Sequence, residues 1–199
     1  MKKLIALLLT AACILALAAC AGKTEPKATE NAGTAEGAAT NAETSGKTLP
    51  EGYCDVGDFT VFVPEGWTAI PVPARDDPSK ILTNDIQLAK DALYNEASKT
   101  WNTDAGTNFY VTLLSQEDFD REPEVRAYYA KDFAVEDMEE LTIGDLTWHG
   151  FMVRPIGAPV YLMWAAKSDG NGGYHTSIST AYGFSLEDAD LQAILGSLK

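Results

Sequence analysis

Asn108-Phe109-Tyr110-Val111-Thr112-Leu113-Leu114-Ser115 is the stretch that decides the fold of this chain. Its aromatic and β-branched residues are typical of a β-strand. Side chains alternate along a strand, so one face carries Phe109, Val111 and Leu113 and the other carries Tyr110 and Leu114. Apolar residues on both faces predict a strand in a sheet that is covered on both sides.

Further strands are predicted on both sides of this stretch. Alternating apolar residues, bounded by turn residues, indicate strands at 58–63, 67–72, 141–143, 146–153, 160–166 and 174–181. Those from 141 onward form two predicted hairpins, around Gly144-Asp145 and around the loop 168–173. The segment 85–89 fits a strand or the start of a helix, and 91–101 fits a continuation of that helix.

Two helices complete the expected architecture. Residues 122–133 carry one apolar stripe and have Pro123 in the first turn, where proline is favoured. The closing helix has Ser185 as its expected N-cap with Asp188 three residues later, and a buried face of Leu191, Ile194, Leu195 and Leu198. The predicted class is α+β, with an antiparallel β-sheet flanked by helices.

Three motifs resemble the PsbP/Mog1-like family. They are Phe59-Thr60-Val61-Phe62-Val63-Pro64-Glu65-Gly66-Trp67, the hairpin 141–150, and the closing helix 186–199. The resemblance spans most of 53–199 and implies an α/β/α sandwich. It carries no site, because that family has no shared catalytic residues and its members are mostly accessory or binding proteins.

The N-terminal region has the pattern of an export signal. Met1-Lys2-Lys3 is basic, and an uncharged apolar run of 16 residues follows from Leu4 to Ala19, short of the ~20 residues of a transmembrane helix. Leu17-Ala18-Ala19-Cys20 resembles the lipobox of bacterial lipoproteins. That resemblance implies a signal peptide over 1–19 and acylation of Cys20. The acylated protein would be anchored on the extracytoplasmic side of a membrane, which can be the outer membrane. The alternative is an ordinary secretory signal.

Residues 20–48 are expected to form a disordered tether. After Cys20 they contain no aromatic residue and no aliphatic residue larger than Ala, so they cannot bury enough apolar surface to fold. Composition changes at Leu49, and residues 49–199 are expected to form a single globular domain. After removal of Lys2 and Lys3 the formal charge falls from −14 to −16, which disfavours nucleic acid and anionic lipid as partners.

No residue pattern predicts catalysis or metal binding. His149 and His175 lie on different predicted strands without ligand spacing, and Asp169-Gly170-Asn171-Gly172-Gly173 lacks the later positions of a calcium loop. The acidic segment 117–145 fits either a solvated face or a surface for a cationic partner. Cys54 is expected to be buried, and next to Asp55 its thiol would have a raised pKa.

Trp101 is the tentative contact residue, because it lies in the least regular and most polar part of the domain. The other three tryptophans, at positions 67, 148 and 164, are expected in the core. We therefore expect a membrane-anchored lipoprotein that acts as a binding or accessory module and is not an enzyme. We expect no cofactor, and the partner, a protein or a small molecule, is unknown. The alternative is a cell-surface hydrolase or isomerase whose site is assembled from distant residues.

Overall fold

The computed structural model describes residues 49–102, 108–155, 158–180 and 185–199. The chain divides into two units, Met1–Glu43 and Thr44–Lys199, and every described residue belongs to the second. The expected signal peptide, the tether 20–48 and Cys20 lie outside the described residues.

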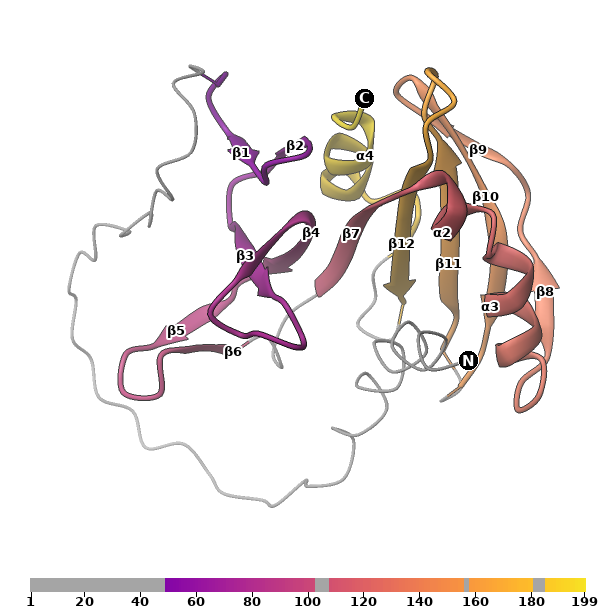
Figure 1. The fold of residues 1–199 in the computed structure, drawn as a ribbon, viewed down its shortest axis with the longest axis horizontal. Coiled ribbons are helices and arrows are strands. Elements are labelled where there is room, and N and C mark those ends of the chain that lie inside the picture. Colours follow the sequence, from indigo (N-terminus) through magenta and orange to yellow (C-terminus); the bar gives the residue numbers. More distant parts are fainter. Residues whose placement is uncertain (1–48, 103–107, 156–157, 181–184) are drawn as a thin grey trace. The chain divides into compact units, whose positions relative to one another are not determined.

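One large antiparallel sheet organises the second unit (Figure 1). Its strand order is β3-β4-β7-β12-β11-β10-β8, and β9 also pairs with β10. The antiparallel sheet of the prediction is confirmed, and the described residues outside it form few and short helices. The strands are β3 (Trp67–Pro73), β4 (Ile81–Lys90), β7 (Asn108–Leu114), β8 (Val135–Asp137), β9 (Leu141–Ile143), β10 (Leu146–Val153), β11 (Val160–Ala166) and β12 (Gly173–Ser179).

Both predicted hairpins of the C-terminal half are confirmed. Leu146 pairs with Ile143 across Gly144, whose φ of 61° is suited to glycine. A Cβ on Gly144 would also lie 2.6 Å from the Gly196 carbonyl oxygen, so this turn needs glycine for space as well. Strands β11 and β12 pair from Val160–Ser179 to Ala166–Gly173.

The prediction of a helix over 91–101 is wrong. After β4 ends, Asp91 has a φ of 54°, which ends the regular strand geometry. The chain then forms a two-stranded hairpin of β5 (Leu93–Asn95) and β6 (Thr100–Asn102). A second small pair, β1 (Tyr53–Asp55) with β2 (Thr60–Phe62), precedes the large sheet.

Three helices are described: α2 (Gln116–Phe119), α3 (Glu122–Tyr129) and α4 (Ala189–Gly196). The N-cap of α4 is Asp188, not Ser185: its side chain accepts hydrogen bonds from the backbone N–H groups of Asp190 and Leu191. No helix among the described residues is long and apolar enough to cross a membrane.

The large sheet contributes to two apolar clusters, one on each face. The first contains the α4 residues Leu191, Ile194 and Leu195, packed with Leu88 and Val111 of the central strands. The second contains Phe151, Leu162 and Trp164 of β10 and β11, with Val125 and Tyr129 of α3 packed against them (Figure 1). Apolar packing on this second face is thus concentrated over β10 and β11.

Candidate functional site

A row of polar side chains crosses the sheet on the face opposite α4. The strand register places Asp85 of β4 opposite Thr112 of β7, and Thr112 opposite His175 of β12. The row continues to Trp164 of β11 and ends at His149 of β10. Directly opposed residues project from the same face, so residues far apart in the sequence become neighbours. We call Asp85, Thr112 and His175 the polar row.

Asp85 is a buried residue that is 9% exposed. Its Oδ1 accepts a hydrogen bond from Thr112 Oγ1 at 3.1 Å. Burial raises the pKa of Asp85 from 3.8 to about 6, and hydrogen bonds from Thr112 and from the backbone of Ile86 oppose that rise. None of the ion pairs between described residues includes Asp85. The carboxylate therefore lacks a cationic partner in the described part of the chain.

His175 lies on the other side of Thr112. Its ring packs against Trp164 with centroids 4.5 Å apart and planes inclined at 50°. Burial lowers the pKa of His175 from 6.5 to about 4, so the ring is neutral at pH 7. No hydrogen bond between described residues uses an imidazole nitrogen of His175. Its donor and acceptor atoms are therefore unused within the described domain.

The row of side chains next to the polar row, toward the start of β7, is uncharged. It contains Gln87, Tyr110 and Ser177. On the other side, Phe119 of α2 lies close to Gly173, where an added Cβ would be 2.5 Å from its ring. Helix α2 thus borders one side of the row.

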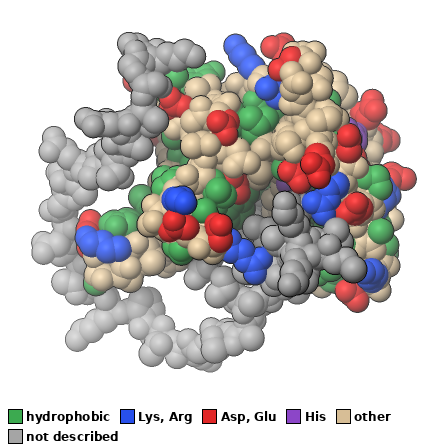
Figure 2. Space-filling view, in the orientation of Figure 1, with side chains coloured by type: hydrophobic (Ala, Val, Ile, Leu, Met, Phe, Trp, Pro, Cys, Tyr) green, Lys and Arg blue, Asp and Glu red, His purple; other side chains and the backbone are tan. Residues whose placement is uncertain are grey.

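Trp101 lies on β6, directly opposite Tyr94 of β5, and is partly exposed. The two rings have centroids 5.0 Å apart. Tyr94 is 42% exposed and Leu93, on the other face of this hairpin, is 67% exposed. Hydrophobic side chains lie at the surface over the hairpin, beside charged groups at its tip (Figure 2). We call Leu93, Tyr94 and Trp101 the aromatic hairpin.

Local hydrogen bonds define the turn of this hairpin. Asn95 Oδ1 accepts from the backbone N–H groups of Ala97 and Ser98 at 3.0 and 3.1 Å. Lys99 has a φ of 55°, and its ammonium lies 2.7 Å from Glu96 Oε2. These contacts constrain the conformation of the turn.

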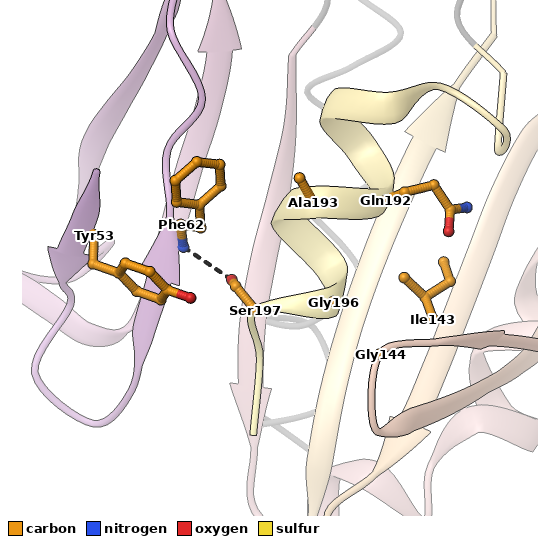
Figure 3. Close-up of a pocket in the computed structure, with 8 residues that line it drawn as sticks. All are labelled: Tyr53, Phe62, Ile143, Gly144, Gln192, Ala193, Gly196 and Ser197. Atoms are coloured by element: carbon orange, nitrogen blue, oxygen red, sulfur yellow. Dashed lines mark hydrogen bonds between the residues drawn. The ribbon is translucent and has the colours of Figure 1, made fainter. Parts of the chain in front are cut away.

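A shallow pocket lies beside α4 on the opposite face of the sheet (Figure 3). Its volume is about 480 Å³. Ser197 Oγ accepts the backbone N–H of Phe62 at 2.9 Å and donates to the Ile194 carbonyl, so this hydroxyl group is already engaged. The lining contains no Asp, Glu, His, Lys or Cys and offers little chemistry: it consists of Tyr53, Phe62, Ile143, Gly144, Gln192, Ala193, Gly196 and Ser197.

The two histidines of the chain are on different strands, as predicted, and they have different partners. His149 Nε2 lies 3.0 Å from Glu122 Oε2 at the start of α3, and its ring makes an edge contact with Phe119. In the loop 168–173, Asp169 Oδ1 accepts the backbone N–H of Asn171. No three His, Cys, Asp or Glu residues of the described ranges are grouped so that they could hold a metal ion.

Several carboxylates of the acidic segment are paired with arginines. Arg121 contacts both Asp118 and Glu124, and Arg126 pairs with Asp137. Figure 2 shows acidic and basic side chains interspersed over the α3 and β8 region. These pairs are typical of a solvated surface.

Cys54 is a free, half-buried thiol. Burial, and secondarily the charge of Asp55, raise its pKa. A raised pKa makes the thiolate scarce at neutral pH, so Cys54 is a poor nucleophile.

No sequence pattern predicts the polar row. Asp85 begins a segment that fits either a strand or a helix, and His175 has no neighbours at ligand spacing. An aspartate within a strand is uncommon, and that was the one local signal. The register that brings Asp85 and His175 to opposite sides of Thr112 is not visible in any local pattern.

Comparisons with known proteins give no family for this chain. No protein-family model matches it, and no curated protein matches it. Among solved structures, it is similar to a crystal structure from Bacteroides thetaiotaomicron VPI-5482, with 14% sequence identity and a TM-score of 0.37. The match covers 71% of this chain and 44% of that one, so the chain spans less than half of that protein's length.

Proposed function

We propose that this chain is a bacterial lipoprotein whose globular domain binds another extracytoplasmic protein. Cys20 carries the lipid, residues 20–48 are the tether, and 49–199 are a PsbP/Mog1-like α/β/α sandwich that acts as a binding or accessory module. The lipobox supports the anchor, and the three sequence motifs support the family. An anchored module gains effective concentration at the membrane, so that modest affinity is sufficient.

The aromatic hairpin is the observation that carries the binding proposal. Tyrosine and tryptophan are enriched among the residues that dominate interface energies, because they bury a large area with few rotatable bonds. The rings of Tyr94 and Trp101 contact each other on one face of the hairpin, with their planes inclined at 54°, and Leu93 is exposed on the other face. An acidic chain of formal charge −14 further favours a partner with a basic surface.

Crosslinking from the hairpin tests the binding proposal. A photoreactive phenylalanine derivative at Leu93 should capture a specific envelope protein in intact cells, and Trp101→Ala should reduce that capture at least tenfold. The same derivative at Ile81, an apolar residue that is 54% exposed on β4, is the matched control. Equal capture from positions 93 and 81, or capture unaffected by Trp101→Ala, would contradict a binding role for the hairpin.

The anchor is tested separately. Cys20→Ala should leave the protein unacylated and shift it from the detergent phase to the aqueous phase on Triton X-114 partition. A Cys54→Ala variant is the matched control and should partition like the parent. If Cys20→Ala also partitioned like the parent, the lipoprotein assignment would be incorrect.

A hydrolase or isomerase is the second candidate, and one observation favours it. The polar row contains two titratable groups with displaced pKa values, Asp85 and His175, which is a feature of many active sites. The binding role remains our first choice, because the Thr112 hydroxyl group donates to Asp85 and no second acid or base in the described ranges contacts that carboxylate.

A further inference from the structure

We propose that the polar row is a binding site for a small organic cation, a ligand with a protonated primary amine at one end and a hydrogen-bonding group at the other. The amine would lie against Asp85, and the second group would reach the His175 imidazole across Thr112. This site is independent of the aromatic hairpin and of the lipid anchor.

The carboxylate of Asp85 defines the charge of the ligand. It is buried, and its contacts with described residues are hydrogen bonds from Thr112 and Ile86, without an ion pair. A buried charge is retained at a cost unless a partner compensates it. Lys90, the lysine of β4, projects from the opposite face of the strand, and its ammonium binds Asp190 of α4 at 2.8 Å. A ligand ammonium would supply the missing counter-charge.

The imidazole of His175 defines the other end of the ligand. Its nitrogens have no protein partner among the described residues, and the ring is held in place by its contact with Trp164. A neutral imidazole can both donate and accept a hydrogen bond, so it fits a second amine or a hydroxyl group. The contact with Trp164 orients the ring without consuming either nitrogen.

The spacing of the strands sets the size of the ligand. Asp85 and His175 are two strands apart, which places their Cα atoms about 10 Å from each other. Both side chains project from the same face of the sheet, and Thr112 lies between them. A chain of about four carbon atoms between the two polar groups would fit this distance.

Charge complementarity favours a cation over other small ligands. The polar row and the row beside it contain one carboxylate and no lysine or arginine. The whole chain carries a formal charge of −14, which attracts cations and repels phosphates and carboxylates. A metal ion is a poorer fit, because no group of three suitable ligands exists in the described ranges.

Nuclear magnetic resonance on the full chain in detergent can test this site directly. The chain has two histidines, so the His175 ring signal is assigned by its loss in His175→Gln. The probe is 1,4-diaminobutane, and the control probe is 1,4-butanediol, which has the same length without charge. The diamine should shift the His175 signal in a saturable way, whereas the diol should leave it unmoved, and the His149 signal should stay fixed with both.

Two variants separate the site from general attraction to an acidic protein. Asp85→Asn should weaken diamine binding at least tenfold. Asp169→Asn removes the same charge from an exposed loop and should leave binding unchanged. Circular dichroism checks that each variant is folded. Thr112→Val gives a second test, and it should weaken diamine binding less than Asp85→Asn does.

Three results would each overturn the proposal. The first is the absence of a saturable His175 shift with the diamine. The second is an equal response to the diol, which would show that charge has no role. The third is equal weakening by Asp85→Asn and Asp169→Asn, which would show that the amine binds the acidic surface without a site. None of these results bears on the crosslinking from Leu93, so the two proposals fail separately.

Discussion

The two faces of the central strands β4, β7 and β12 differ sharply in composition. Toward α4, these strands carry Leu88, Val111 and Ile178, each no more than 1% exposed. On the opposite face, the same three strands carry Asp85, Thr112 and His175. One face holds the domain together, and the other has groups whose burial is costly. The alternation of side chains lets one strand serve both purposes without conflict.

The largest expected effect is a loss of stability on the face toward α4. Leu88→Ala should lower the free energy of unfolding by about 3 kcal/mol, because it removes a fully buried side chain and leaves a cavity. Gln87→Ala, one residue earlier and on the opposite face, should cost less than about 1 kcal/mol, since its amide makes one long hydrogen bond of 3.3 Å to Asn108. Urea denaturation measures both, and equal losses would refute the division between the faces.

Removal of the buried charge of Asp85 should have the next largest effect on stability, and it should stabilise the domain. The pKa of Asp85 is raised from 3.8 to about 6, so the folded state holds its proton over a range where the unfolded state has lost it. The contribution of Asp85 to the free energy of unfolding is fully present below pH 3.8, and it is lost as the pH rises through about 6. Asp85→Asn should therefore stabilise the domain at pH 8 by about 2 kcal/mol and have little effect at pH 4.

His175 should show the reverse dependence on pH. Its folded pKa of about 4 is below the ordinary 6.5, so the unfolded state binds a proton more readily and stability rises as pH increases from 4 to 6.5. Between pH 4 and 6 the contributions of Asp85 and His175 oppose each other. Asp85→Asn leaves the contribution of His175, so its stability should rise more steeply with pH than that of the parent. His175→Gln leaves the contribution of Asp85, so its stability should fall as pH rises. Urea denaturation across this range checks both, and parallel curves for the three proteins would contradict the assignment.

The smallest effects compare two threonines that lie on opposite faces of neighbouring strands. Thr176, toward α4, is fully buried, and its hydroxyl group has no hydrogen-bond partner among the described residues. Thr176→Val should stabilise the domain by about 1 kcal/mol, since it replaces an unsatisfied hydroxyl group by a methyl group. Thr112→Val should destabilise it by about 1 kcal/mol, because Asp85 loses a donor. A shift of the same sign in both melting curves would be inconsistent with this reading.

Much of the fold could be predicted because its elements carry local signals. Aromatic and β-branched residues predict the strand at 108–114, and the Gly-Asp turn predicts the hairpin at 141–153; the structure contains both. A local pattern gives a wrong prediction where it fits both a helix and a hairpin. The segment 91–101 has apolar residues at helical spacing, yet Asp91 and Lys99 adopt positive φ and the chain folds into a hairpin. Ser185 is the predicted N-cap of the closing helix, and the observed N-cap is Asp188. Serine and aspartate are both favoured at that position, so the sequence alone does not distinguish them.

The candidate sites were less predictable than the fold. The polar and irregular surroundings of Trp101 predict a contact residue, and the structure gives its ring a partner, Tyr94, that the pattern does not indicate. The polar row was not predicted at all. Its residues come from three segments separated by 27 and 63 positions, and a site of that kind has no motif.

The sequence by itself determined the strands β2, β3, β7 and β9 to β12, the apolar face of the closing helix, and the strong negative charge of the chain. These follow from alternation and composition, which are local properties. The tertiary structure alone decided that β4, β7 and β12 are neighbours and that Asp85 and His175 flank Thr112. Strand order and register depend on backbone hydrogen bonds between distant segments, and every residue except proline can make those bonds.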